Sequence, residues 1–149
     1  MLETGVGADV NFEVGETFPA HRRLLAARSS VFMAQLFGPM EEKDATCIQI
    51  VDMDARVFKM MLQFIYTDTL PSIDDDEITE MAQHLFVAAD RYNLGRLKLI
   101  CTTMLCDRID SITVPTMLAF AERHGCDRLK KACFKFLASP KYQIGRAHV

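Results

Sequence analysis

The stretch ADVNFEVGETFPAHRRLLAARSSVF, residues 8–32, contains the pattern that decides the fold. Apolar and polar residues alternate from Ala8 to Val14, which predicts a half-buried strand. Gly15-Glu16 is a pair suited to a two-residue turn, and TFPAH, residues 17–21, predicts the returning strand. The segment from His21 to Arg28 is rich in Leu, Ala and Arg, which are good helix formers. We therefore expect a β-hairpin that leads directly into a helix.

The rest of the chain predicts one more strand and then mostly helix. The fold class is α+β: a small three-stranded sheet capped by a cluster of helices, followed by a helical hairpin around Gly125. Hydrophobic periodicity and capping residues predict the third strand at 46–51 and a helix that begins after a cap at Asp54. They predict further helices at 31–37, 78–89, 94–107, 113–124 and 126–138.

Composition limits the classes of function. The 149 residues are 50% hydrophobic, enough for a real core, and the net charge of −3 gives no general attraction to nucleic acid. Five cysteines without a CxxC pair are typical of free thiols in a reducing compartment. Neither a leader peptide nor an apolar run near the ~20 residues of a membrane span is visible. We expect a cytoplasmic or nuclear protein that binds neither nucleic acid nor membrane.

The sequence AHRRLL raises three alternatives: a nucleic-acid-binding helix, a catalytic histidine, or a surface that meets another protein. In a helix, Arg22 and Arg23 project about 100° apart and cannot share one narrow basic face. From periodicity alone the segment is an ordinary solvated amphipathic helix.

Motifs of catalysis are absent from the sequence, including the P-loop, GxGxxG, GxSxG and HExxH. His124 and Cys126 are the closest histidine and cysteine, but a nucleophilic thiol needs a base held at hydrogen-bond distance. We expect a chain that is not an enzyme and has no cofactor, metal or catalytic residue. A thiol- or histidine-dependent enzyme at His124 and Cys126 is the alternative from another class.

Several motifs agree in order and spacing with a known family. The stretch quoted above, then FGPMEE, FKMMLQFIYTD and LFVAADRYNLGRLKLIC, resembles the BTB/POZ domain, and in particular that of plant MATH-BTB proteins related to the speckle-type POZ protein. The resemblance places a BTB/POZ domain at residues 8–107 and the start of a helical, BACK-like extension at 108–139. Residues 140–149 are expected to form a disordered tail.

The resemblance implies a function that composition could not show. Proteins of this type are substrate adaptors of cullin-3 RING ubiquitin ligases, in which the MATH domain captures the target and the BTB domain dimerises and binds the cullin. The expected partners are thus a second copy or a related BTB protein, and cullin-3. Because no MATH domain is present, we do not expect a substrate protein to bind directly.

The resemblance also implies residues of a dimer interface. Asp9 matches an acidic position and Arg22 a basic position that face a charged pocket at that interface, and Leu24 matches an apolar position in the same surface. In family members a leucine-rich helix before the first strand also contributes to this interface, and we expect most of that helix to be missing here.

A second set of residues is implied for cullin binding. Met40 and Glu42, in PMEE, match the apolar-any-Glu pattern that contacts the cullin, and Phe37 and Tyr66 are further candidates for that surface. A flexible Met can fill an apolar site on a partner. The alternative function is a BTB module used only for assembly, or a truncated competitor of full-length MATH-BTB proteins.

Overall fold

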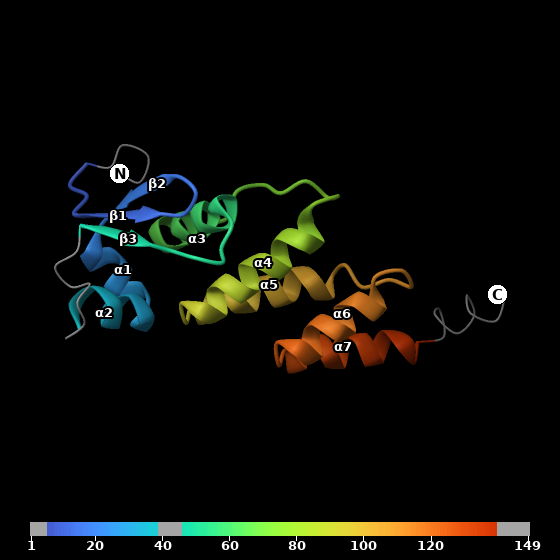
Figure 1. Ribbon diagram of the computed structural model, residues 1–149. Coiled ribbons are helices and arrows are strands. Elements are labelled where there is room, and N and C mark those ends of the chain that lie inside the picture. The colour runs from blue at the N-terminus through green and yellow to red at the C-terminus, as the bar shows by residue number, and fades with distance from the viewer. Residues whose placement is uncertain (1–5, 39–45, 140–149) are drawn as a thin grey trace.

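The computed structural model describes residues 6–38 and 46–139. At one end lies the sheet with α1, α2 and α3, and the helices α4 to α7 extend from it toward the C-terminal end (Figure 1). The bounds are β1 Val10–Glu13, β2 Thr17–Ala20, α1 Arg22–Arg28, α2 Ser30–Phe37, β3 Cys47–Gln49, α3 Ala55–Thr67, α4 Ile78–Arg91, α5 Gly95–Cys106, α6 Val114–Arg123 and α7 Asp127–Leu137. The predicted α+β class with a three-stranded sheet is confirmed.

The sheet has the order β2-β1-β3, with β2 antiparallel and β3 parallel to β1. Gly15 adopts φ +79°, which glycine permits at low cost, and the chain turns there between β1 and β2. Pro19 lies in β2, an edge strand, where the missing backbone N–H breaks no ladder bond on the open side. β3 is shorter than the predicted segment 46–51 because it pairs only with Asn11 to Glu13.

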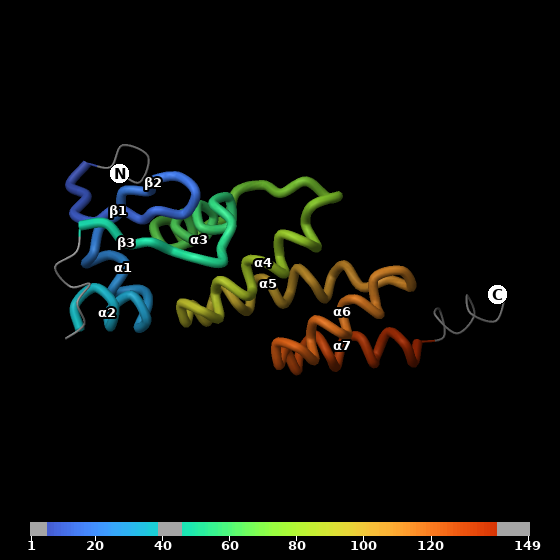
Figure 2. The backbone as a smooth tube through the Cα atoms, viewed as in Figure 1, coloured from blue at the N-terminus to red at the C-terminus, as the bar shows by residue number. Residues whose placement is uncertain are grey.

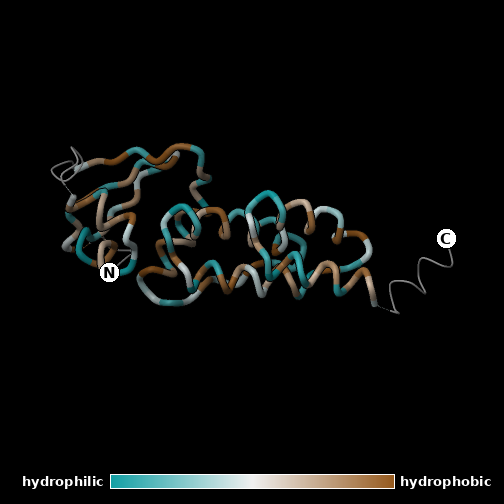
Figure 3. Tube along the Cα trace, turned by 90° about the horizontal axis from the view of Figure 1, so that it is seen from below, coloured by the Kyte–Doolittle hydropathy of each residue, from teal (hydrophilic) through white to brown (hydrophobic). Residues whose placement is uncertain are grey.

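One apolar core runs under the sheet and through the helices. Phe12 is fully buried between Phe32 of α2 and Phe58 of α3, at ring-centroid distances of 5.5 and 5.4 Å. The helix α3 buries more than one of its faces, as the sequence predicts, and it lies close to the sheet (Figure 2). Along α4 to α7, hydrophobic and hydrophilic segments alternate (Figure 3), as expected of helices with one buried side.

Local signals set several helix ends. The Asp54 side chain accepts a hydrogen bond from the Arg56 N–H at 2.8 Å and caps α3. Ser29 separates α1 from α2 and caps α2, since its Oγ accepts the Phe32 N–H at 3.1 Å. Gly125, at φ +64°, ends α6 and permits the hairpin into α7.

Candidate functional site

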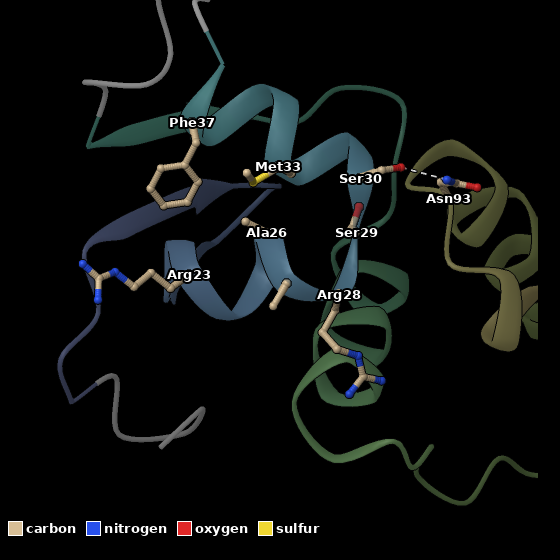
Figure 4. Close-up of a pocket in the computed structure, with 9 residues that line it drawn as sticks. Arg23, Ala26, Arg28, Ser29, Ser30, Met33, Phe37 and Asn93 are labelled. Atoms are coloured by element: carbon tan, nitrogen blue, oxygen red, sulfur yellow. Dashed lines mark hydrogen bonds between the residues drawn. The ribbon is translucent and has the colours of Figure 1, made fainter.

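The helices α1 and α2 form the wall of an open groove of about 780 Å³. In Figure 4, the side chains of Met33 and Phe37 from α2 and Arg23 from α1 lie at its edge, and Asn93 closes it on the other side. The lining residues are Arg23, Ala26, Ala27, Arg28, Ser29, Ser30, Met33, Phe37 and Asn93. Asn93 is held there by a hydrogen bond from its Nδ2 to the Ser30 Oγ at 2.8 Å.

Two large apolar side chains lie exposed on the groove side of α2. Met33 is 52% exposed and Phe37 46%, while the neighbouring Ala26 and Ala27 of α1 leave room for an incoming side chain. Exposed apolar groups that cluster in this way are typical of a protein–protein interaction surface. The chemistry this surface can perform is therefore binding.

The arginines of α1 do not form one basic patch. Arg28 donates to the Asp68 carboxylate, which Arg96 also approaches at 3.5 Å, and the pKa of Asp68 is lowered mainly by the hydrogen bond from Arg28. Arg22 points inward and is only 9% exposed, whereas Arg23 is exposed at the groove. This arrangement does not favour the nucleic-acid alternative, which needs several cations along one side.

The structure brings Asp9 and Arg22 together, and each of two hydrogen bonds between them uses a backbone atom of one of the residues. The backbone N–H of Arg22 donates to Asp9 Oδ1 at 2.8 Å, and its Nε lies 3.4 Å from the Asp9 carbonyl oxygen. Its Nη1 lies 3.3 Å from the carbonyl of Leu36, so that the guanidinium joins α1 to the end of α2. Leu24 is half-buried on α1. The assignment of these residues to a dimer interface stays a prediction.

The four residues expected to bind cullin are distributed as follows. Phe37 is exposed at the end of α2, and Tyr66 is half-buried near the end of α3 with its hydroxyl bonded to His21. Met40 and Glu42 lie outside the described residues.

The alternative enzyme site has the contacts of a packed helix junction. The His124 ring packs against Phe120 at a centroid distance of 4.5 Å, and Cys126, which is buried, has its Sγ 3.6 Å from the Thr102 hydroxyl. A threonine hydroxyl is not a base at neutral pH. In residues 6–38 and 46–139, no group of three or more His, Cys, Asp or Glu side chains could hold a metal ion. That same part of the chain has no helix that is long and apolar enough to cross a membrane.

Sequence reasoning missed the contacts that hold the groove together. The ring of Phe32 stacks on that of Tyr92 at a centroid distance of 4.3 Å, and Ser29 Oγ donates to the Tyr92 carbonyl at 2.6 Å. Asn93 adopts φ +54°, a conformation that Asn tolerates better than most residues, and this places its amide over Ser30. The YNLG segment, residues 92–95, contains Asn and Gly, which indicate a turn, but nothing in it indicates that Asn93 bonds to Ser30, 63 residues earlier.

A small sheet flanked by helices, with an exposed apolar helix face, defines a protein-interaction domain. The family model of the BTB/POZ domain matches residues 1–109, so this chain belongs to the BTB/POZ family. The model of the BPM/SPOP BACK domain matches residues 113–143. The domain boundary predicted between residues 107 and 108 stays a prediction, and the predicted tail at 140–149 lies outside the described residues.

Relatives of this chain include BTB/POZ and MATH domain-containing proteins of Arabidopsis thaliana. The chain is 46% identical to BTB/POZ and MATH domain-containing protein 3 over 148 residues, which cover 94% of this chain and 36% of that protein. It is 40% identical to BTB/POZ and MATH domain-containing protein 4, with 99% of this chain and 34% of that protein covered. This chain thus spans about a third of the length of these relatives.

A solved structure has the same fold. The BTB domain of zebrafish PATZ1 superposes with a TM-score of 0.55 at 26% sequence identity, over 66% of this chain and 75% of that one. The predicted resemblance to BTB domains of MATH-BTB proteins is confirmed.

Proposed function

We propose that this chain is a non-catalytic interaction module that dimerises and forms part of a substrate adaptor, which recruits a cullin-3 RING ubiquitin ligase. The observation that carries the proposal is the apolar face of α2, where Met33 and Phe37 are about half exposed beside a groove lined by small alanines. A chain with BTB and BACK matches and an unpaired apolar face is suited to bind proteins.

Dimerisation would have a physical consequence for an adaptor. Two linked binding sites make the second binding event intramolecular, and so convert weak contacts into strong overall binding. The residues that we assign to the dimer are Asp9, Arg22 and Leu24, and those that we assign to the cullin are Phe37, Met40, Glu42 and Tyr66. A substrate protein would be captured by another domain or another chain.

The test is titration calorimetry of the purified chain with an N-terminal fragment of cullin-3 at tens of micromolar. We expect binding, and we expect a Met40→Asp, Glu42→Lys double variant to abolish it while the circular dichroism spectrum stays unchanged. A matched control is Glu16→Lys, an exposed charge change in the β1–β2 turn. No binding by the unmodified chain refutes the cullin assignment, and full binding by the double variant moves the site elsewhere.

The alternative is a module for assembly, or a competitor of full-length MATH-BTB proteins. The observation in its favour is that the BTB/POZ match and the exposed apolar face of α2 support contact with proteins in general. Co-expression with a full-length relative separates the two functions, because a competitor lowers the ligase activity of the mixture whereas an adaptor does not.

A further inference from the structure

Three hydrogen bonds join His21, the residue immediately before α1, to segments outside that helix. Its backbone N–H donates to the Tyr66 hydroxyl oxygen at 2.9 Å, and its ring Nδ1 lies 2.7 Å from the same oxygen. On the other side of the ring, Nε2 lies 2.6 Å from the carbonyl oxygen of Val6. One side chain thus connects α3 to the segment that precedes β1.

The partners determine where the protons lie. The Val6 carbonyl can only accept, so Nε2 must carry a hydrogen, and Nδ1 of the neutral ring is then an acceptor. The Tyr66 hydroxyl donates to Nδ1 while it accepts the backbone N–H. Burial raises the pKa of Tyr66, and the charge of Asp9 raises it further against the lowering effect of the His21 N–H. The hydroxyl therefore keeps its proton, and what Tyr66 offers a partner is its ring.

The segment before β1 is shaped to reach this histidine. Gly7 adopts φ +77°, a conformation that L side chains rarely adopt, and a Cβ there would lie 3.6 Å from His21 Nε2. The backbone N–H of Asp9 donates to the Ala20 carbonyl at 3.1 Å, so that the segment is also fixed to β2. The Val6 carbonyl is thus presented to the imidazole by a turn that favours glycine.

We propose that His21 is a positioning residue of the cullin surface: its Nδ1 accepts the Tyr66 hydroxyl and so orients the Tyr66 ring for the partner. The inference rests on the proposed function and names how one residue of its site is positioned. A side chain with an acceptor at the Nδ1 position should therefore hold the Tyr66 ring in the same way.

The charged groups around His21 come from two elements. Asp9 lies before β1 and acts on Tyr66, and the guanidinium of Arg22 lies against the Asp9 and Leu36 carbonyls. Neither charged group replaces the imidazole as the acceptor for the Tyr66 hydroxyl. Loss of that acceptor should therefore loosen the Tyr66 ring and weaken partner binding.

Two substitutions separate the two sides of the ring. His21→Gln keeps an N–H that can reach Val6 but removes the acceptor for Tyr66, whereas His21→Asn keeps an acceptor at the Nδ1 position. Titration calorimetry with the cullin-3 N-terminal fragment at about pH 7.5 should give a Kd about fivefold weaker for His21→Gln, the effect of one lost hydrogen bond. His21→Asn should stay within about twofold of the unmodified chain, an effect well below that of a lost hydrogen bond.

A double variant completes the test. Tyr66→Phe should weaken binding like His21→Gln, and the double variant should be no weaker than either single one, because both remove the same bond.

The outcomes distinguish the inference from the proposed function. If the unmodified chain binds and His21→Gln binds equally well, or if His21→Asn is weakened as much as His21→Gln, the positioning role is overturned and the cullin assignment stays intact. If the Gln variant fails to fold, Tyr66→Phe decides in its place. No binding by the unmodified chain overturns the proposed function, and the inference falls with it.

Discussion

Replacing Ser29 by alanine should destabilise the chain at the junction that supports the groove. Ser29 is 1% exposed, its Oγ caps α2 by accepting the Phe32 N–H, and it donates to the Tyr92 carbonyl at 2.6 Å. Loss of an N-cap costs about 1 kcal/mol. Loss of a buried hydrogen-bond donor to a carbonyl costs about another 1 to 2 kcal/mol. We therefore expect the free energy of unfolding to fall by about 2 to 3 kcal/mol.

The adjacent serine is the matched control. Ser30 is exposed, and its Oγ only accepts the Asn93 amide at 2.8 Å, so Ser30→Ala should change the free energy of unfolding by about 0.5 kcal/mol or less. Urea unfolding followed by circular dichroism measures both variants, and in thermal unfolding the Ser29 variant should lose about 6 °C or more in Tm. Equal stability of the two variants, or a Ser29 variant within about 0.5 kcal/mol of the unmodified chain, would refute the reasoning.

Three further perturbations test other parts of the structure. Met33→Glu, beside Phe37 in the groove, should weaken binding of the cullin-3 N-terminal fragment in calorimetry, whereas Val87→Glu, at an exposed apolar site on α4, should not; unchanged affinity of both variants would remove the groove from the cullin surface. In native buffer, iodoacetamide should label the exposed Cys47 first and leave Cys101 unlabelled until urea is added, because burial raises the pKa of Cys101 to about 12; mass spectrometry of proteolytic peptides would show the opposite order if that packing were wrong. The pKa of Asp110 is lowered mainly by the hydrogen bond from the Thr113 backbone N–H, with a further one from the Ile112 backbone N–H. The contribution of Asp110 to stability is therefore present above the ordinary carboxyl pKa of 3.8 and is lost as the pH falls through the lowered pKa. Between neutral and acidic pH, the Tm of Asp110→Asn should fall less than the Tm of the unmodified chain, and equal losses would contradict this.

The local features of the fold could be predicted from neighbouring residues. The alternation from Val10 to Val14 indicates a strand because successive side chains point to opposite faces of a sheet. Asp54 and Gly125 mark a helix start and a helix end because their conformations and hydrogen bonds involve residues at most four positions away. The resemblance to the BTB family likewise depended on the order of short motifs along the chain.

The site depended on contacts between residues that are distant in sequence. Tyr66 meets His21 across 45 residues, and Ser29 meets the Tyr92 carbonyl across 63, so neither pair is visible in a local pattern. Arg22 could be placed near Asp9, but only the packing of α1 on α2 decided that its guanidinium reaches the Leu36 carbonyl and is buried.

By itself the sequence determined the strands and the helices, because hydrophobic periodicity and capping act over a few residues. The resemblance of its ordered motifs indicated the family. Only the tertiary structure decided that β3 pairs parallel to β1, that Met33 and Phe37 stay exposed beside a groove, and that His21 joins Tyr66 to Val6. The physical reason is that hydrogen bonds and burial at these positions depend on where the chain returns after many residues, which no local propensity encodes.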